Sequence, residues 1–186
     1  MTAKLLLLMT ALTITACSER GGNQQTPVSG NSAPVIKAPP DVSGTPIIDH
    51  SGKQIGMVAA RLEKDGVAVS VDTVGLPAGT HGVHIHEIPK CEPPTFESAG
   101  GHWNWTNRKH GHKNPQGYHA GDLGNLTVGA DGKGRATFHV PLKDWDPKQA
   151  GGLPVVIHAS ADDDMTDPSG NSGARIACGV LYLRRN

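Results

Sequence analysis

The sequence predicts an all-β domain, a sandwich or barrel built from short strands. Glycine (24 residues) and proline (14 residues) are abundant in the 186-residue chain and aromatic residues are few (4%), a composition that favours turns and strands over helices. The apolar residues fall in short valine-rich runs, and some of these alternate with polar residues at the two-residue period of a strand. The domain sequence shows no long helical pattern, so we expect strands to form the core.

In chain order, the pattern predicts strands at residues 54–62, 67–74, 81–87, 124–128, 135–140, 154–158 and 175–183. The first two flank the turn signal KDG, and valines alternate with smaller or polar residues in the second, which predicts a hairpin with one buried face. The fourth and fifth flank the turn signal ADG and are expected to form a second hairpin. The other three are short apolar runs.

Two stretches between these strands, 88–121 and 159–174, are too long and too polar to be simple turns. Loops of that length in a compact domain are usually functional or disordered. The sequence therefore predicts that function is concentrated in these two loops.

The charges of the chain balance. Lysine plus arginine (17) equal aspartate plus glutamate (17), so there is no basic excess to bind nucleic acid and no acidic excess typical of disorder. We expect no nucleic-acid partner, and an anion that the protein uses must be attracted locally. Once a leader and a tail are set aside, residues 43–186 remain, which are enough for one domain and too few for two.

The N-terminal residues 1–16 have the pattern of a secretory signal peptide. Lys4 supplies the positive charge, and the apolar stretch from Leu5 to Ile14 is too short to span a bilayer. The signal ends in ITAC, which resembles the bacterial lipoprotein signal, whose cysteine becomes the lipidated first residue. Cys17 would then anchor the chain to a membrane. The alternative is ordinary cleavage nearby, with Cys17 incidental.

Residues 17–42 are rich in Gly, Asn, Gln, Pro and Ser and are interpreted as a lipid-anchored flexible tether. The expected location is therefore the bacterial cell envelope, in the periplasm or on the outer face of the cytoplasmic membrane. With Cys17 assigned to lipid, Cys91 and Cys178 are the only cysteines left, in an exported chain where oxidation is permitted. A disulfide is expected; the alternative, thiolate metal ligands, is weaker because neither cysteine has a CxxC partner.

The histidines point to metal chemistry. His84 and His86 are two residues apart on an expected strand, so both side chains leave the same face, although such a pair alone is more often a polar strand face. Imidazoles suit copper and zinc, and a carboxylate can complete a zinc tetrahedron. The further candidate ligands are His102, His110, His119, Asp122 and His158. The alternative is that ten histidines in 186 residues cluster by chance.

The order of these motifs resembles the copper,zinc superoxide dismutase family. The matching segments are HGVHIHE at 81–87, SAGGHWN at 98–104, KHGHKNPQGYHAGDLGN at 109–125, VIHASADD at 156–163 and GNSGARIACGV at 170–180. Together they cover the domain from about residue 45 to its end. The resemblance implies a Greek-key β-barrel or flattened sandwich with two long functional loops.

The resemblance also implies one copper ion and one zinc ion. The implied copper ligands are His84, His86, His102 and His158. The implied zinc ligands are His102, His110, His119 and Asp122, so His102 would bridge the two metals. Asp162 matches a carboxylate that links His84 to His110, and Arg175 matches the arginine beside the copper. Cys91 and Cys178 match the family's disulfide.

The implied activity is the dismutation of superoxide to oxygen and hydrogen peroxide, an antioxidant function that would protect the envelope. Copper would cycle between two oxidation states, zinc would be structural, His102 would carry a proton, and Arg175 would attract and orient the anion. The alternative for Arg175 is a surface cation that ties down its loop. The alternative function is a non-catalytic envelope protein that binds or delivers copper or zinc. The family includes monomers and dimers, so a homodimer is left open.

Some residues depart from the family or match no ligand in it. Trp103 and Trp105 stand where the family more usually has Phe and Pro, which puts the local loop shape in question. The segment 162–175 is shorter than in the animal enzymes and has no recognisable set of steering lysines. His81 is expected to be a structural hydrogen-bonding residue, and the other unmatched histidines are expected at the surface: His50, His112 and His139. Asp163 and Asp164 are expected to be solvated charges.

Overall fold

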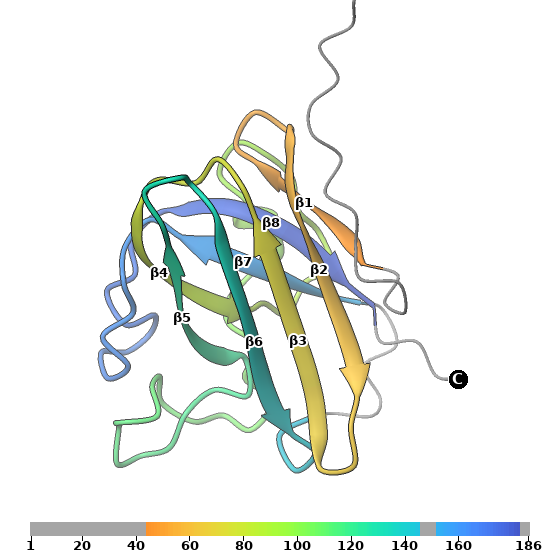
Figure 1. Ribbon diagram of the computed structural model, residues 1–186. Coiled ribbons are helices and arrows are strands. Elements are labelled where there is room, and N and C mark those ends of the chain that lie inside the picture. The colour runs from red at the N-terminus through yellow and green to blue at the C-terminus, as the bar shows by residue number, and fades with distance from the viewer. Residues whose placement is uncertain (1–43, 146–151, 183–186) are drawn as a thin grey trace, which may run out of the picture. The chain divides into compact units, whose positions relative to one another are not determined.

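The computed structural model describes residues 44–145 and 152–182 of the chain (Figure 1). The expected signal peptide, Cys17 and the tether therefore lie outside the described residues. Within the described ranges, no helix has the length and apolar character needed to cross a membrane.

Eight antiparallel strands close into a barrel, which confirms the predicted all-β fold (Figure 1). They are β1 (Thr45–Asp49), β2 (Gln54–Leu62), β3 (Gly66–Thr73), β4 (Gly79–Ile85), β5 (Asp122–Val128), β6 (Gly134–Pro141), β7 (Leu153–His158) and β8 (Arg175–Leu181). Their order around the barrel is β1-β2-β3-β6-β5-β4-β7-β8, so β3 lies beside β6 and β4 beside β7, crossovers of the Greek-key kind. A short 3₁₀-helix, η1 (Glu97–Ala99), lies in the long loop after β4.

Two features of the barrel differ from the sequence prediction. The strand β1 was not expected, because its sequence TPIID is too short to show a period, yet it closes the barrel by pairing with both β2 and β8. The expected second hairpin is only partly formed. The strands β5 and β6 pair only at Val128 and Gly134, whereas β6 pairs with β3 along its whole length. The other predicted strands are present, with ends shifted by at most two residues.

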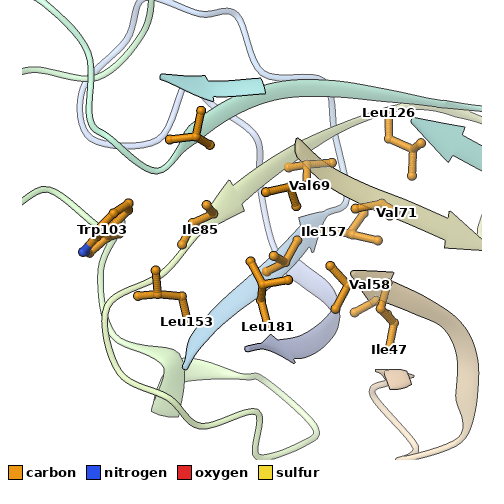
Figure 2. Close-up of a cluster of buried hydrophobic side chains, with 14 of the residues drawn as sticks. Ile47, Val58, Val69, Val71, Ile85, Trp103, Leu126, Leu153, Ile157 and Leu181 are labelled. Atoms are coloured by element: carbon orange, nitrogen blue, oxygen red, sulfur yellow. The ribbon is translucent and has the colours of Figure 1, made fainter. Parts of the chain in front are cut away.

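Apolar side chains from the strands fill the barrel (Figure 2). Val67, Val69 and Val71 of β3 are each 0% exposed, and Ser70 between them is exposed, so the predicted buried face of this strand is confirmed. Burying one such side chain contributes about 1.5–3 kcal/mol to folding. Ile85 of β4 and Ile157 of β7 also point into the core (Figure 2).

The outer wall of the barrel carries the candidate ligands. Because side chains alternate along a strand, the histidines next to Ile85 and Ile157 leave the outer face of β4 and β7. These two strands are paired, with His84 opposite Val156. His86 lies just beyond β4 and forms an isolated bridge with His102, which brings the long loop back to the end of this strand.

Candidate metal centre

Four imidazole rings meet on the outer wall of β4 and β7. They belong to His84, His86, His102 and His158. One ring nitrogen from each lies within 4.8 Å of those of the other three. His84 and His86 are 0% exposed, so this cluster of polar groups is shielded from water.

Each of the four rings has one buried nitrogen without a hydrogen-bond partner. These atoms are Nδ1 of His84 and Nε2 of His86, His102 and His158. A buried polar atom left unpaired costs about 1–3 kcal/mol, and such atoms are rare in folded proteins. Four of them in one place indicate a site for a metal ion, because an ion accepts the lone pairs that no donor satisfies.

The opposite nitrogens of three rings are hydrogen-bonded. Nε2 of His84 lies 2.8 Å from Asp162 Oδ2, Nδ1 of His86 lies 3.0 Å from the Gly100 carbonyl, and Nδ1 of His158 lies 3.1 Å from the Gly173 carbonyl. Carbonyl and carboxylate oxygens only accept, so each neutral ring donates from its bonded nitrogen and keeps its lone pair on the unpaired one. Four imidazole lone pairs suit copper.

A second donor set surrounds Asp122 at the start of β5. Its Oδ1 lies 3.0 Å from Nδ1 of His102, 3.0 Å from Nδ1 of His110 and 3.3 Å from Nδ1 of His119. Its Oδ2 accepts hydrogen bonds from the backbone N–H groups of Gly111 (2.8 Å) and His119 (3.0 Å). The backbone therefore orients the carboxylate so that Oδ1 faces the three rings.

These separations fit a tetrahedral zinc site. Zinc bonds of about 2.0–2.1 Å place neighbouring ligand atoms about 3.3 Å apart at the corners of a tetrahedron. The Nδ1 atoms of His102 and His119 are 3.3 Å apart, as such an edge requires. Three imidazoles and one carboxylate are zinc ligand types. His102 contributes Nδ1 to this set and the unpaired Nε2 to the first, so it is shared by both.

Asp162 joins the two donor sets. Its Oδ2 accepts from His84 and its Oδ1 accepts from Nε2 of His110 at 3.0 Å. Asn125 of β5 holds the backbone of Asp162 through two hydrogen bonds, of 2.9 Å to its carbonyl and 2.8 Å from its N–H. Gly170 passes so close that a Cβ there would lie 1.7 Å from Asp162 Oδ1.

Sequence reasoning assigned no role to Asn125 or Gly170. Gly170 has a φ of 61°, and both this backbone conformation and the close approach to Asp162 require glycine. A third omitted residue is Asp167, whose Oδ1 accepts from the backbone N–H of His110 at 2.9 Å. The available signal was that Asn125 and Gly170 lie inside the matched motifs; Asp167 lies outside them.

Burial keeps the rings of the first set neutral. It lowers the pKa of His84 to about 3, that of His86 to about 2 and that of His158 to about 4. His110 differs, because the hydrogen bonds to Asp122 and Asp162 outweigh the opposing effect of burial and raise its pKa to about 10. The paired rings hold the pKa values of both carboxyl groups well below the usual range, despite burial.

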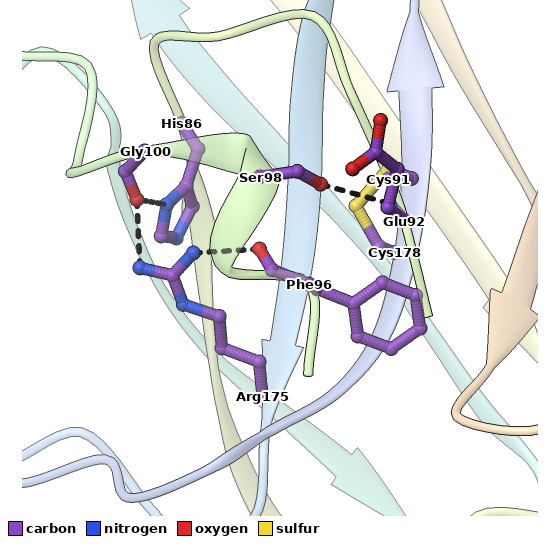
Figure 3. The surroundings of a disulfide bond; sticks show 8 residues. All are labelled: His86, Cys91, Glu92, Phe96, Ser98, Gly100, Arg175 and Cys178. Carbon is purple, nitrogen blue, oxygen red and sulfur yellow. Dashed lines mark hydrogen bonds between the residues drawn. A yellow bond between two sulfur atoms is a disulfide. The ribbon is translucent and has the colours of Figure 1, made fainter. Parts of the chain in front are cut away.

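Arg175, the first residue of β8, is held beside His86. Its Nη1 donates to the Phe96 carbonyl (2.7 Å) and its Nη2 donates to the Gly100 carbonyl (2.7 Å), which also accepts from His86 (Figure 3). These bonds use two of the five N–H donors of the guanidinium, which leaves donors for an anion. The arginine therefore does tie down its loop, as one reading of the sequence expected, without using up its hydrogen-bonding capacity.

A pocket of about 440 Å³ opens beside Arg175 and is also lined by Pro94, Thr95, Glu97, Gly173 and Ala174. Burial lowers the pKa of Arg175, and the nearby Glu97 charge partly offsets this effect. An arginine remains protonated at neutral pH in any protein environment. The wall of this pocket thus carries the fixed positive charge of Arg175 and, near it, the carboxylate of Glu97.

The Cys91–Cys178 disulfide joins the long loop to β8, which confirms the predicted pairing (Figure 3). The thiolate-ligand alternative is therefore wrong. Cys178 belongs to a small second core with Phe96, Ala99 and Val156, in which Phe96 is 0% exposed. Because the Phe96 carbonyl accepts from Arg175, the disulfide and this core fix the backbone that holds the arginine.

The unmatched histidines lie outside both donor sets. His81 is buried, with its ring nitrogens 2.8 Å and 2.9 Å from the carbonyls of His158 and Pro77, as expected of a structural residue. The other three are exposed: His50, His112 and His139. Near His139, Glu63 and Asp65 each add a carboxylate, but the two carboxylates face different nitrogens of its ring.

The expectation that Asp163 and Asp164 are only solvated charges was incomplete. Asp163 accepts hydrogen bonds from the backbone N–H groups of Met165 (2.9 Å) and Thr166 (2.8 Å). Asp164 accepts from the backbone N–H of His112 at 2.7 Å. Asp163 therefore holds the turn of its own loop, since short polar side chains bond readily to nearby backbone groups, and Asp164 joins this loop to the loop that carries His112.

A closed antiparallel barrel with two adjoining donor sets that share one histidine defines a copper- and zinc-binding protein of the superoxide dismutase fold. Comparison with known proteins agrees, because the model of the Copper/zinc superoxide dismutase (SODC) family matches residues 54–181. The chain belongs to the copper/zinc superoxide dismutase family, and its cofactors are copper and zinc.

Several bacterial relatives are similar over most of their length. A copper-zinc superoxide dismutase of Deinococcus radiodurans is 38% identical over 189 residues, which cover 94% of this chain and 93% of the relative. A superoxide dismutase-like protein of Bacillus subtilis is 38% identical over 190 residues, with coverage of 95% and 94%. The solved Cu/Zn superoxide dismutase of Brucella abortus is 30% identical, with a TM-score of 0.63 and coverage of 75% of this chain and 99% of that one.

Proposed function

We propose that this protein dismutates superoxide to oxygen and hydrogen peroxide. The observation that carries the proposal is the complete set of unpaired nitrogens on His84, His86, His102 and His158, with Arg175 held beside them. Copper bound by these nitrogens would supply a centre that takes an electron from one superoxide and gives it to another. Family membership supports the same activity.

The residues around the metals would have separate tasks. Arg175 attracts the superoxide anion into the pocket and orients it with its free N–H groups. Nε2 of His102 has no protein partner, so whenever it is not bound to copper it could hold the proton that a forming peroxide requires. Asp122, His110 and His119 would hold zinc, which has no redox chemistry and therefore acts through position and charge. Asp162 fixes His84 and His110 through their Nε2 atoms.

We further propose that the protein works in the cell envelope, exported by residues 1–16 and anchored by lipid at Cys17. The support is the pattern of the N-terminal sequence, in which a short apolar stretch ends in small residues and a cysteine. Cys17→Ala should shift the protein out of the membrane fraction of its source cells. Membrane attachment that survives this substitution would contradict the anchor.

One observation favours a second candidate, a non-catalytic protein that binds or delivers copper or zinc. A relative that is 38% identical is described only as superoxide dismutase-like. Against this candidate stand the full donor set and Arg175, because a metal buffer has no need of an arginine that orients an anion.

Dismutation by the full chain tests the proposal. The protein loaded with copper and zinc is compared with the same protein loaded with zinc alone, and the intact disulfide is verified in both. Rapid turnover that depends on copper supports the enzyme. Absence of turnover from a fully metallated, folded sample would reject it in favour of the metal-handling protein.

A further inference from the structure

All three tryptophans of the chain gather where the loop that carries the zinc-ligand histidines meets the segment after β6. Trp103 and Trp145 are both buried in the main core, with ring centroids 5.2 Å apart in an edge-to-face arrangement. Trp105 is 49% exposed, and its indole N–H donates to the backbone carbonyl of Asp144 at 2.8 Å. Trp103 and Trp105 follow His102 in the sequence, and the ring of His102 is shared by both donor sets.

The side chain of Asp144 holds the other end of the same loop. Asp144 is only 8% exposed, and its Oδ2 accepts a 2.7 Å hydrogen bond from the hydroxyl of Tyr118. Tyr118 directly precedes His119. Lys143 lies on the outer side of this pair and donates to the same oxygen at 2.7 Å. Asp144 therefore contacts the loop next to His102 through its carbonyl and next to His119 through its carboxylate.

The loop needs such a support because no regular strand carries its ligands. Residues 103–121 contain no strand or helix, and His110 and His119 both lie within them. A zinc ion that had to order this loop would lose affinity by the conformational entropy of ordering, whereas a loop already held in place avoids that loss. Outer contacts that orient ligands typically change metal affinity by about 10- to 100-fold.

We propose that Asp144 is a positioning residue for zinc: through the Asp144–Tyr118 hydrogen bond it holds the loop in the conformation that brings His119 to Asp122. The inference rests on the zinc site and not on dismutation, so it stands or falls separately from the proposed activity. It also assigns a role to the two tryptophans of this loop: Trp103 packs on Trp145 and Trp105 bonds to Asp144, and these contacts attach the end of the loop next to His102.

The test measures zinc release from the metallated full chain to a chromogenic chelator, in the absence of superoxide. Asp144→Ala and Tyr118→Phe should each release zinc about tenfold faster than the unaltered protein. Asp144→Asn, which keeps an oxygen to accept from the tyrosine, should recover most of the loss. The matched control is Asp72→Ala, which removes a carboxylate that pairs with Arg135 on the barrel wall and should release zinc at the normal rate.

Two further readouts separate positioning from general destabilisation. Cobalt placed in the zinc site should show an altered visible spectrum in Asp144→Ala and a normal one in Asp72→Ala. The double variant Asp144→Ala/Tyr118→Phe should release zinc little faster than Asp144→Ala alone, because both changes break the Asp144–Tyr118 bond and differ only in which partner of the exposed Lys143 they remove.

The proposal is overturned if Asp144→Ala binds and releases zinc like the Asp72→Ala control, or if the two changes add fully in the double variant. Where Asp144→Ala fails to fold, Tyr118→Phe decides, because it removes one hydroxyl and leaves the ring in place. Unchanged zinc release from folded Tyr118→Phe would then reject the role of this hydrogen bond.

Discussion

Replacing Asp162 with alanine should weaken zinc binding more than copper binding. The carboxylate accepts from Nε2 of His84 at 2.8 Å and from Nε2 of His110 at 3.0 Å, so the substitution removes an acceptor from one ring of each donor set. His84 lies within β4, where strand pairing still fixes its backbone. His110 lies in the irregular loop and loses one of its few anchors. In the zinc set, His110 therefore loses both a hydrogen bond and part of what fixes its position, whereas in the copper set His84 loses only a hydrogen bond.

The size of the effect follows from the bonds that are lost. A hydrogen bond to a charged group contributes about 1.5–3 kcal/mol, and about 1.4 kcal/mol corresponds to a tenfold change in affinity. We therefore expect zinc affinity to fall about 100-fold and copper affinity about tenfold. Asp72→Ala is the control, because it removes a carboxylate that pairs with Arg135 on the barrel wall and bonds to neither donor set.

Competition with chelators of known affinity, followed by measurement of bound metal, gives both constants for Asp162→Ala and for the control. Equal losses of the two metals would refute the argument that loop and strand positions differ in their need for support. Unchanged affinity for both would refute the orienting role of Asp162 altogether.

Three other predictions concern charge, the disulfide and pH. Arg175→Gln should lower the dismutation rate about tenfold or more while copper affinity stays within twofold, since local positive charge raises the capture of anions; a rate equal to that of the unaltered enzyme would sink this role. Cys178→Ser should lower the free energy of unfolding by about 2–4 kcal/mol, measured in denaturant, and slow turnover by loosening the hold on Arg175; a stability that is unchanged would contradict the structural role. The metal-free protein should lose stability as the pH falls from about 6.5 towards 4, because His84, His86 and His158 stay neutral when folded and take up protons when unfolded, at a cost of up to about 1.4 kcal/mol per ring and pH unit. A melting temperature that is constant over this range would show that the rings are not buried as described.

Local sequence patterns were enough to predict most of the barrel. The alternation of valines in β3 reports a buried face directly, since residues two apart share a side of the strand. The strand β1 escaped prediction because its existence depends on partners far away in the sequence, such as Cys178 opposite Ile48. The same reason explains why the second hairpin was predicted wrongly in part. Proximity in the sequence favoured pairing of β5 with β6, but β6 pairs with β3 along its full length.

The candidate ligands could be identified because their order and spacing form matched motifs, and the barrel brings all of them into two adjoining donor sets. The supporting residues could not be identified in this way. Asp144 and Tyr118 are 26 residues apart in the sequence, and Asn125 and Asp162 are 37 residues apart, so no local sequence pattern predicts either contact. Such contacts depend on which loops the fold places side by side, and only the structure supplies that information.

The closure of the barrel by β1 also bears on how the protein would misassemble. A sheet with a free edge offers unpaired N–H and C=O groups to a second molecule and can template intermolecular strands. The described strands form a ring that β1 closes by pairing with β2 and β8, but β5 and β6 pair only at Val128 and Gly134, so β5 keeps a largely unpaired edge on that side. Aggregation of this protein would therefore start most readily at the β5 edge that faces β6, from opening of the short strand β1, or from loops that have lost their metal or their disulfide.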